Sequence, residues 1–269
     1  MVLNEGSFIY KEINYCIKNN IDFIANLGHS TILFSYKGKK ILTDPFLSPH
    51  IFGIKRQKPA LKPELIPKVD YILISHAHYD HLDINTLKNL NKNSVLIVPK
   101  NTGFLVKNLG FKDVIELKNW ENFTNSDIEI HSLPVKHNNG RLPFFLHTGT
   151  NSYFVKFNGI SFYFLGDSAY FKDLKKFGEM FNIDFAFLPI GGFKPEIIFK
   201  NFHMNPYQAV QAFKDLNAKC FVPIHYGTFH VIPPFVYWEK PLEKLISSVK
   251  QENLIENLMV VKPNHIATT

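Results

Sequence analysis

The clearest chemical signal in the sequence is a cluster of imidazole and carboxylate side chains. Within six consecutive positions stand His76, His78, Asp80 and His81. The apolar run at 69–74 before them is typical of a buried strand, and 83–90 after them has helical spacing, with Asp83 placed to cap the helix. The cluster is therefore predicted to lie on a strand-to-helix turn at the carboxyl end of a strand, where α/β sheets commonly bind ligands.

The spacing suits a metal ion. In extended backbone, positions two apart point the same way, so His76 and His78 can hold one ion. Asp80 and His81 come after the chain turns and face the same hollow from another side. Imidazole and carboxylate are ligands that zinc or iron accepts, and the segment has no cysteine. A histidine-rich surface loop is the alternative interpretation.

Three further candidates, His137, Asp167 and His225, each follow a predicted strand. Taken singly, such a residue is more often a cap or a satisfied polar group than a ligand. Taken with the cluster, they complete two coordination groups with room for a shared water. These are His76, His78 and His137 for one ion, Asp80, His81 and His225 for a second, and Asp167 bridging the two.

Composition limits the classes of function. The 269 residues, 45% of them apolar, are enough for one large domain, predicted to span 1–269. The net charge of +7 comes from scattered basic residues and suits an anionic substrate or surface; without a dense basic run, we expect no nucleic-acid partner.

The cysteine content and the lack of long apolar stretches both predict a protein of a reducing, aqueous compartment. Two cysteines, Cys16 and Cys220, favour reduced thiols over a disulfide scaffold. The first residues lack the pattern of a signal peptide, and no stretch reaches the roughly 20 apolar residues of a membrane span. We expect a cytoplasmic protein without a transmembrane segment, and homo-oligomerisation stays open.

Strands and helices recur in two similar halves, which predicts two packed sheets with helices outside. After an amphipathic lead-in at 1–20, the first half has predicted strands at 22–27, 31–36, 39–42, 69–74, 94–98 and 114–117, helices at 83–90 and 102–109, and a long loop at 46–67. The second half has predicted strands at 128–133, 152–157, 160–165, 183–188, 220–224 and 258–261, and helices at 171–181, from Pro206 and at 242–249.

The order of these motifs resembles the metallo-β-lactamase superfamily. Closer similarity to N-acyl-phosphatidylethanolamine-hydrolysing phospholipase D and its microbial relatives lies in the segments 28–33, 42–45, 74–83, 166–170, 189–193, 203–206 and 224–229. The ascorbate-6-phosphate lactonase group shares part of this pattern. The resemblance implies an α/β (α+β) fold, a four-layer αββα sandwich with a dinuclear site at one edge of its two sheets.

The resemblance also implies roles for individual residues. Two divalent ions, zinc in the first place with manganese or iron as alternatives, would hold a bridging hydroxide that attacks a phosphodiester. Asp80 and Asp167 would steer its proton. Residues expected beside the ligands are His203 as a catalytic group, Asp44 as acceptor of a ligand N–H, and His29 near the substrate. Apart from the resemblance, Tyr226 is expected either to hydrogen-bond a substrate oxygen or to pack.

Other interpretations use the same residues. A lactone or other ester is the alternative substrate, and a non-catalytic metal-binding protein or a di-iron redox protein is the alternative of another class. The expected substrate is small and anionic, with a phospholipid as one candidate. Lys55 and Arg56 are candidates for its head group, and an apolar acyl channel is a hypothesis for Phe193, Phe199 and Phe202.

Overall fold

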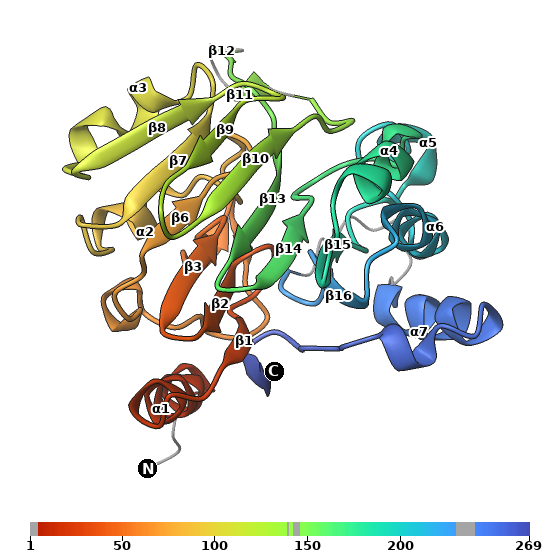
Figure 1. Ribbon diagram of the computed structural model, residues 1–269, viewed down its shortest axis with the longest axis horizontal. Helices are drawn as coiled ribbons and strands as arrows, with labels where there is room; N and C mark the ends of the chain where they lie inside the picture. The colour runs from red at the N-terminus through yellow and green to blue at the C-terminus, as the bar shows by residue number, and fades with distance from the viewer. Residues whose placement is uncertain (1–4, 139, 142–145, 230–239) are drawn as a thin grey trace.

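Two mixed β-sheets face each other and carry helices on their outer faces (Figure 1). The computed structural model describes residues 5–138, 140–141, 146–229 and 240–269. The predicted αββα sandwich is confirmed by this arrangement of layers.

The first sheet joins an antiparallel half to a parallel half through β3 and β6. Its strands, in spatial order, are β17 (His265–Thr268), β1 (Phe23–Asn26), β2 (Ile32–Tyr36), β3 (Lys39–Thr43), β6 (Tyr71–Leu73), β7 (Val95–Pro99) and β8 (Asp113–Leu117). The helices on this side are α1 (Glu5–Lys18), α2 (Ile84–Lys88) and α3 (Gly103–Val106), with 3-10 turns η1 (Pro63–Leu65) and η2 (Lys107–Leu109).

In the second sheet, β14, β15 and β16 run parallel and the other strands antiparallel. Its strands, in spatial order, are β16 (Cys220–Ile224), β15 (Phe185–Pro189), β14 (Ile160–Phe164), β13 (Ser152–Phe157), β10 (Glu129–Leu133) and β9 (Asn122–Thr124). The remaining elements are α4 (Asp173–Met180), α5 (Glu196–Phe199), α6 (Pro206–Leu216), α7 (Pro241–Gln251), η3 (Ile255–Asn257) and the hairpins β4 (His50–Ile51) with β5 (Ile54–Lys55) and β11 (Gly140–Arg141) with β12 (Leu146–His147).

Three layers of buried apolar side chains hold the sandwich together. One layer lies between the sheets, where the Phe34 ring packs 5.2–6.2 Å, centroid to centroid, from four other phenylalanine rings. A second layer joins the first sheet to α1, α2 and α3, and a third joins the second sheet to α4, α6 and α7. Burial of these faces drives the packing of the helices on the sheets.

One strand prediction is wrong. Residues 258–261 form no strand in the structure; Leu258 makes an isolated bridge to Phe221. The last strand is β17, which pairs with β1 at the edge of the other sheet. Its sequence, His265-Ile266-Ala267-Thr268, has little apolar signal because an edge strand with half-exposed faces needs none. The short elements β9, the β4–β5 hairpin and α5 were also missing from the prediction, and the helix expected at 102–109 divides into α3 and η2.

The predicted helix caps and the predicted hairpin turn are confirmed. The Asp83 carboxylate caps α2 by accepting a hydrogen bond from the Asn85 N–H at 3.0 Å. Asn205 and Gln208 form a capping box at the start of α6, with Pro206 in its first turn. Asn158 and Gly159 turn the β13–β14 hairpin with φ of 50° and 85°.

The topology brings the candidate residues to one edge of the sandwich. His76 follows β6, His137 follows β10, Asp167 follows β14 and His225 follows β16, in each case just beyond the carboxyl end of the strand. Asp44 likewise follows β3. Strands whose carboxyl ends share an edge deliver these side chains to a common place, although they are far apart along the chain.

Among the described residues, no helix has both the length and the apolar character needed to cross a bilayer.

Replacement of Asn205 tests the importance of the cap that starts α6 directly after His203. Asn205→Ala removes the acceptor for the Gln208 N–H and is expected to lower the free energy of unfolding by about 1 kcal/mol. Urea denaturation measures the change. Tyr207→Ala, at an exposed position of the same turn, is the control, and an equal loss in both variants would contradict the capping role.

Candidate metal centre

The structure brings together the seven predicted ligands. In the first group, His76 Nε2 lies 2.9 Å from His78 Nδ1, and His137 Nε2 lies 3.3 Å from the same atom. In the second group, Nε2 of His81 and Nε2 of His225 each lie 3.2 Å from a carboxylate oxygen of Asp167. Asp80 completes the set, with Oδ2 3.9 Å from His81 Nε2. Their assignment as metal ligands stays a prediction, because the distances describe proximity alone.

The outer hydrogen bonds of the first group fix which ring nitrogens carry protons. The carbonyl oxygen of Phe202 can only accept, so His137 donates through Nδ1–H at 2.9 Å and turns an unprotonated Nε2 inward. The Ser75 hydroxyl donates to Asp44 at 2.6 Å, so its oxygen accepts from His76 Nδ1–H at 2.9 Å. His76 therefore also presents Nε2 as a lone pair.

Asp44 also fixes which ring nitrogen carries the proton in the second group. Its carboxylate is fully buried and accepts three hydrogen bonds, from Ser75 N–H at 2.7 Å, from the Ser75 hydroxyl, and from His81 Nδ1–H at 2.6 Å. Since Nδ1 of His81 holds the proton, Nε2 faces Asp167. A carboxylate that accepts the outer N–H of a ligating imidazole orients the ring and increases its basicity.

Several polar atoms in the middle of the group are buried without a hydrogen-bond partner: His81 Nε2, Asp167 Oδ1, both ring nitrogens of His225, and His203 Nδ1. A buried polar atom without a partner is rare and calls for an ion or water. Nε2 of His76 and Nε2 of His137 converge on His78 Nδ1, at 2.9 and 3.3 Å, an arrangement of ring nitrogens that a cation among them would stabilise. The donor set therefore fits divalent cations of the kind that imidazole and carboxylate bind.

The electrostatics of the group depend on burial and on close charges. Burial, with imidazole neighbours, holds the pKa of His76 well below its usual value. For His81, burial opposes protonation but is outweighed by three carboxylates, Asp167, Asp44 and Asp80, so its pKa is raised. The pKa of Asp167 is lowered because the rings of His225 and His81 outweigh the cost of burial.

His29 lies beside the second group. Its Nε2–H donates to Asp80 Oδ2 at 3.0 Å, and its ring centroid is 4.0 Å from that of His225. The main chain is fixed as well, because His29 N–H donates to Thr228 Oγ1 and its carbonyl accepts from the His225 N–H. The expected position of His29 beside the ligands is thus the position that it has in the structure.

Three residues of the centre have left-handed backbone. His29, Asp44 and His225 have φ of 56°, 34° and 59°. Each such residue costs roughly 1–3 kcal/mol and persists only where its surroundings hold it. A glycine makes room here, because a Cβ on Gly192, itself at φ 75°, would lie 3.0 Å from His225 Cε1 and 3.2 Å from His203 Nδ1.

His203 joins the group between its two halves. Nδ1 of His203 lies 3.8 Å from Asp167 Oδ2, and its ring centroid is 5.2 Å from that of His137. The same Nδ1 is one of the buried atoms without a partner. The residue reaches this place because the α5 turn and the start of α6 flank it.

The side chains of Tyr226 and Arg56 make main-chain hydrogen bonds, and Lys55 lies at the surface. The Tyr226 hydroxyl donates to the Val261 carbonyl at 3.4 Å, and its ring packs in the core beneath α6 and α7. Lys55 is exposed. The Arg56 guanidinium donates to the carbonyls of Leu27 and Phe46, both at 2.7 Å, so it fastens one loop to another.

The three phenylalanines predicted to line an acyl channel lie in different surroundings. Phe193 is buried, with Lys244 Nζ 5.4 Å from its ring centroid. Phe199 lies 6.0 Å, centroid to centroid, from His203, and Phe202 lies 6.3 Å from His137. Sequence reasoning gave no role to Ser75, although it joins Asp44 to His76; its place directly before the first histidine was the only signal.

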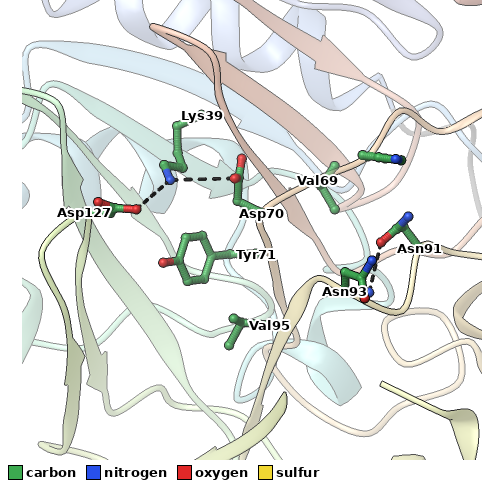
Figure 2. A pocket seen from close by; sticks show the side chains of 9 residues that line it. Lys39, Val69, Asp70, Tyr71, Asn91, Asn93, Val95 and Asp127 are labelled. Atoms are coloured by element: carbon green, nitrogen blue, oxygen red, sulfur yellow. Dashed lines mark hydrogen bonds and ion pairs between the residues drawn. The ribbon is translucent and has the colours of Figure 1, made fainter. Parts of the chain in front are cut away.

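A second hollow, of about 340 Å³, lies at the opposite, amino-terminal ends of β3, β6 and β7 (Figure 2). Within it, Lys39 Nζ lies 3.0 Å from Asp127 and 3.6 Å from Asp70. No histidine is among the described residues that line it. Lys39 pairs with its two carboxylates, and the described lining of this hollow lacks the imidazole donors of the metal centre.

Comparison with known proteins places this geometry in a family. A beta-lactamase superfamily domain matches residues 39–226, a range that runs from β3 through all seven predicted ligands. The chain belongs to the metallo-β-lactamase superfamily. It is 34% identical over 245 residues to N-acyl-phosphatidylethanolamine-hydrolyzing phospholipase D 1 of Caenorhabditis elegans, covering 83% of this chain and 68% of that protein. It is also 34% identical over 235 residues to a UPF0173 metal-dependent hydrolase of Bacillus mycoides, covering 79% and 90%.

Among the other similar proteins, one is matched over slightly less than two thirds of its own length, and one, a solved structure, shows likeness of fold alone. An uncharacterized protein of Mycobacterium tuberculosis is 32% identical over 250 residues, which are 86% of this chain and 65% of that protein. A solved structure of a possible metal-dependent hydrolase from Veillonella parvula superposes with a TM-score of 0.73 at 17% identity, covering 93% of this chain and 100% of the other.

The buried imidazoles predict how the stability of the metal-free protein depends on pH. Burial lowers the pKa of His29 and His203 to about 4 and that of His137 to about 3, whereas the unfolded chain takes up these protons near pH 6.5. As pH falls from 6.0 to 4.5, the unfolded state therefore binds more protons, and each imidazole lowers the free energy of unfolding by up to about 1.4 kcal/mol per pH unit.

Two other groups do not reverse this sign. His81 is protonated in both states below pH 6.5, and Asp44, whose pKa burial raises, opposes the trend with one proton at most. Urea midpoints of the metal-free protein across this range measure the slope. A midpoint that is constant or rises with falling pH would contradict the neutral, buried state of these rings.

Proposed function

We propose that this protein is a metal-dependent hydrolase that cleaves phosphodiesters in the manner of a phospholipase D. The observation that carries the proposal is the group of buried lone pairs and carboxylate oxygens without partners at the carboxyl ends of the strands. Similarity to a nematode phospholipase D and to metal-dependent hydrolases supports it.

The residues divide between two divalent cations, for which zinc is the expected metal. His76, His78 and His137 would hold one, and Asp80, His81 and His225 the other, with Asp167 between them. Such cations, when bound, lower the pKa of a coordinated water to near neutrality and stabilise charge on phosphoryl oxygens.

The other side chains set orientation and proton transfer. Asp44 holds the rings of His81 and, through Ser75, of His76, so that neither can turn its protonated nitrogen inward. Asp167, whose low pKa keeps it ionised, lies between the two groups, where its carboxylate would orient the proton of the water. The unpartnered Nδ1 of His203 faces the same carboxylate, within reach of a substrate or leaving-group oxygen.

A phosphodiester is the substrate class that the chemistry favours over a lactone. The chain carries a net charge of +7, which suits an anionic substrate, and a second similar protein, from Saccharomyces cerevisiae, is also named an N-acyl-phosphatidylethanolamine-hydrolyzing phospholipase D. A phospholipid is the proposed natural form of this diester.

A substrate comparison tests this proposal. With zinc-loaded protein, kcat/KM for a bis-aryl phosphate diester is expected to exceed that for a lactone by about tenfold or more, a difference of about 1.4 kcal/mol in transition-state stabilisation. Metal analysis is expected to give two ions per chain. Faster turnover of the lactone would assign the centre to ester hydrolysis, and iron with a redox-active absorption band would assign it to redox chemistry.

Removal of single ligands tests the metal chemistry. His78→Ala and Asp80→Ala are each expected to reduce diester hydrolysis to the uncatalysed background while the far-UV circular dichroism stays unchanged, because neither side chain belongs to an apolar core. His265→Ala, at an exposed position of β17, is the control that keeps its activity. Normal turnover in either ligand variant would overturn the assignment.

A further inference from the structure

The chain has 28 lysines and only two arginines, Arg56 and Arg141. Both guanidinium groups leave the surface and bind main-chain carbonyls of loops near the metal centre. Where lysine is the default cation, an arginine in such a place suggests that the planar guanidinium itself is needed. Arg141 is the more buried of the two, with 8% of its surface exposed.

Arg141 binds both ends of the turn that carries most of the predicted ligands. Its Nη1 donates to the carbonyl of Ala77 and, at 3.1 Å, to the carbonyl of Leu82. Ala77 lies between His76 and His78, and Leu82 directly follows His81. One guanidinium nitrogen thus bridges the beginning and the end of the turn, here called the ligand loop (residues 76–82).

Aromatic stacking adds a third contact with the ligand loop. The Arg141 guanidinium carbon lies 3.8 Å from the centroid of the Tyr79 ring, which stands midway along the loop. A guanidinium that lies over an aromatic face while one of its nitrogens donates to two carbonyls combines contacts that an ammonium group reproduces poorly. The three contacts together fix the start, the middle and the end of the loop.

Arg141 also connects two parts of the centre that are far apart in sequence. It belongs to β11, in the segment that follows His137, whereas the ligand loop follows β6. The main chain of the residue before it, Gly140, lies within reach of the ring of His78. The relative position of His137 and His78, both in the first group of predicted ligands, therefore depends on this junction.

From these contacts we infer that Arg141 is a positioning residue of the metal centre, which holds the ligand loop against the His137 segment so that their ring nitrogens converge. The inference rests on the proposed metal-dependent function. It assigns to Arg141 an effect on metal affinity that exceeds its effect on the stability of the fold, because the buried carbonyls that it binds belong to the loop.

Metal affinity of stripped protein tests the inference. Zinc is titrated in competition with a chromophoric chelator into the full chain and into R141M and R141K. R141M removes the donors and is expected to bind zinc 10–100-fold more weakly, the range seen when an outer partner of a ligand is lost. R141K keeps the charge but neither the planar fork nor the stacking, and it is expected to lose about tenfold.

Lys92→Met is the matched control. Lys92 also donates to a helix carbonyl, that of Leu87, and its Nζ lies 4.3 Å from the Phe111 ring centroid, but it stands beyond α2, away from the ligand loop. Its loss is expected to lower the melting temperature of the metal-free protein without changing zinc affinity.

The outcomes separate the inference from the proposed function. Absence of zinc binding by the wild-type chain would overturn both. Wild-type binding with unchanged affinity in R141M, or in R141K where R141M does not fold, would overturn the role of Arg141 alone. A weaker affinity in the arginine variants, with melting temperatures of the metal-free proteins no lower than that of the Lys92 variant, would support it.

Discussion

The buried carboxylate of Asp44 links the two halves of the candidate centre. It accepts hydrogen bonds from Ser75 and His81, and through Ser75 it determines the tautomer of His76. Burying a charge is costly, and here three short hydrogen bonds offset part of that cost, although burial still raises the pKa of Asp44. The direction in which the unprotonated nitrogens point, on which any metal chemistry depends, follows from this one group.

The sandwich supplies the frame for that interaction. Asp44 comes from the end of β3 and the ligand loop from the end of β6, and these two strands are parallel neighbours in the first sheet. Asp167 and His225 arrive from the second sheet. The apolar layer between the sheets thus determines the distance between the ligands that come from the first sheet and those that come from the second, and a change in sheet packing would be transmitted to the centre.

Much of the fold and of the candidate centre was predictable because local patterns carried it. The spacing of His76, His78 and His81 is readable within a few residues, and Asn205 and Asp83 cap helices as their positions indicate. The role of Arg141 depends on a hydrogen bond to a carbonyl 59 positions away, which no local pattern reveals. Tyr226 was expected either to hydrogen-bond a substrate oxygen or to pack, and the sequence did not decide between them; its ring packs in the core and its hydroxyl donates to the Val261 carbonyl.

The pairing of β17 with β1 makes the order of synthesis matter. Asn26 pairs with His265, and its side chain donates to the Val261 carbonyl and accepts from the N–H of Gly28, the residue before His29. Until residues 261–268 leave the ribosome, the outer edge of β1 has no partner from β17 and the turn at Gly28 lacks this support. Until then the chain carries an open sheet edge, the kind of edge on which chains associate wrongly.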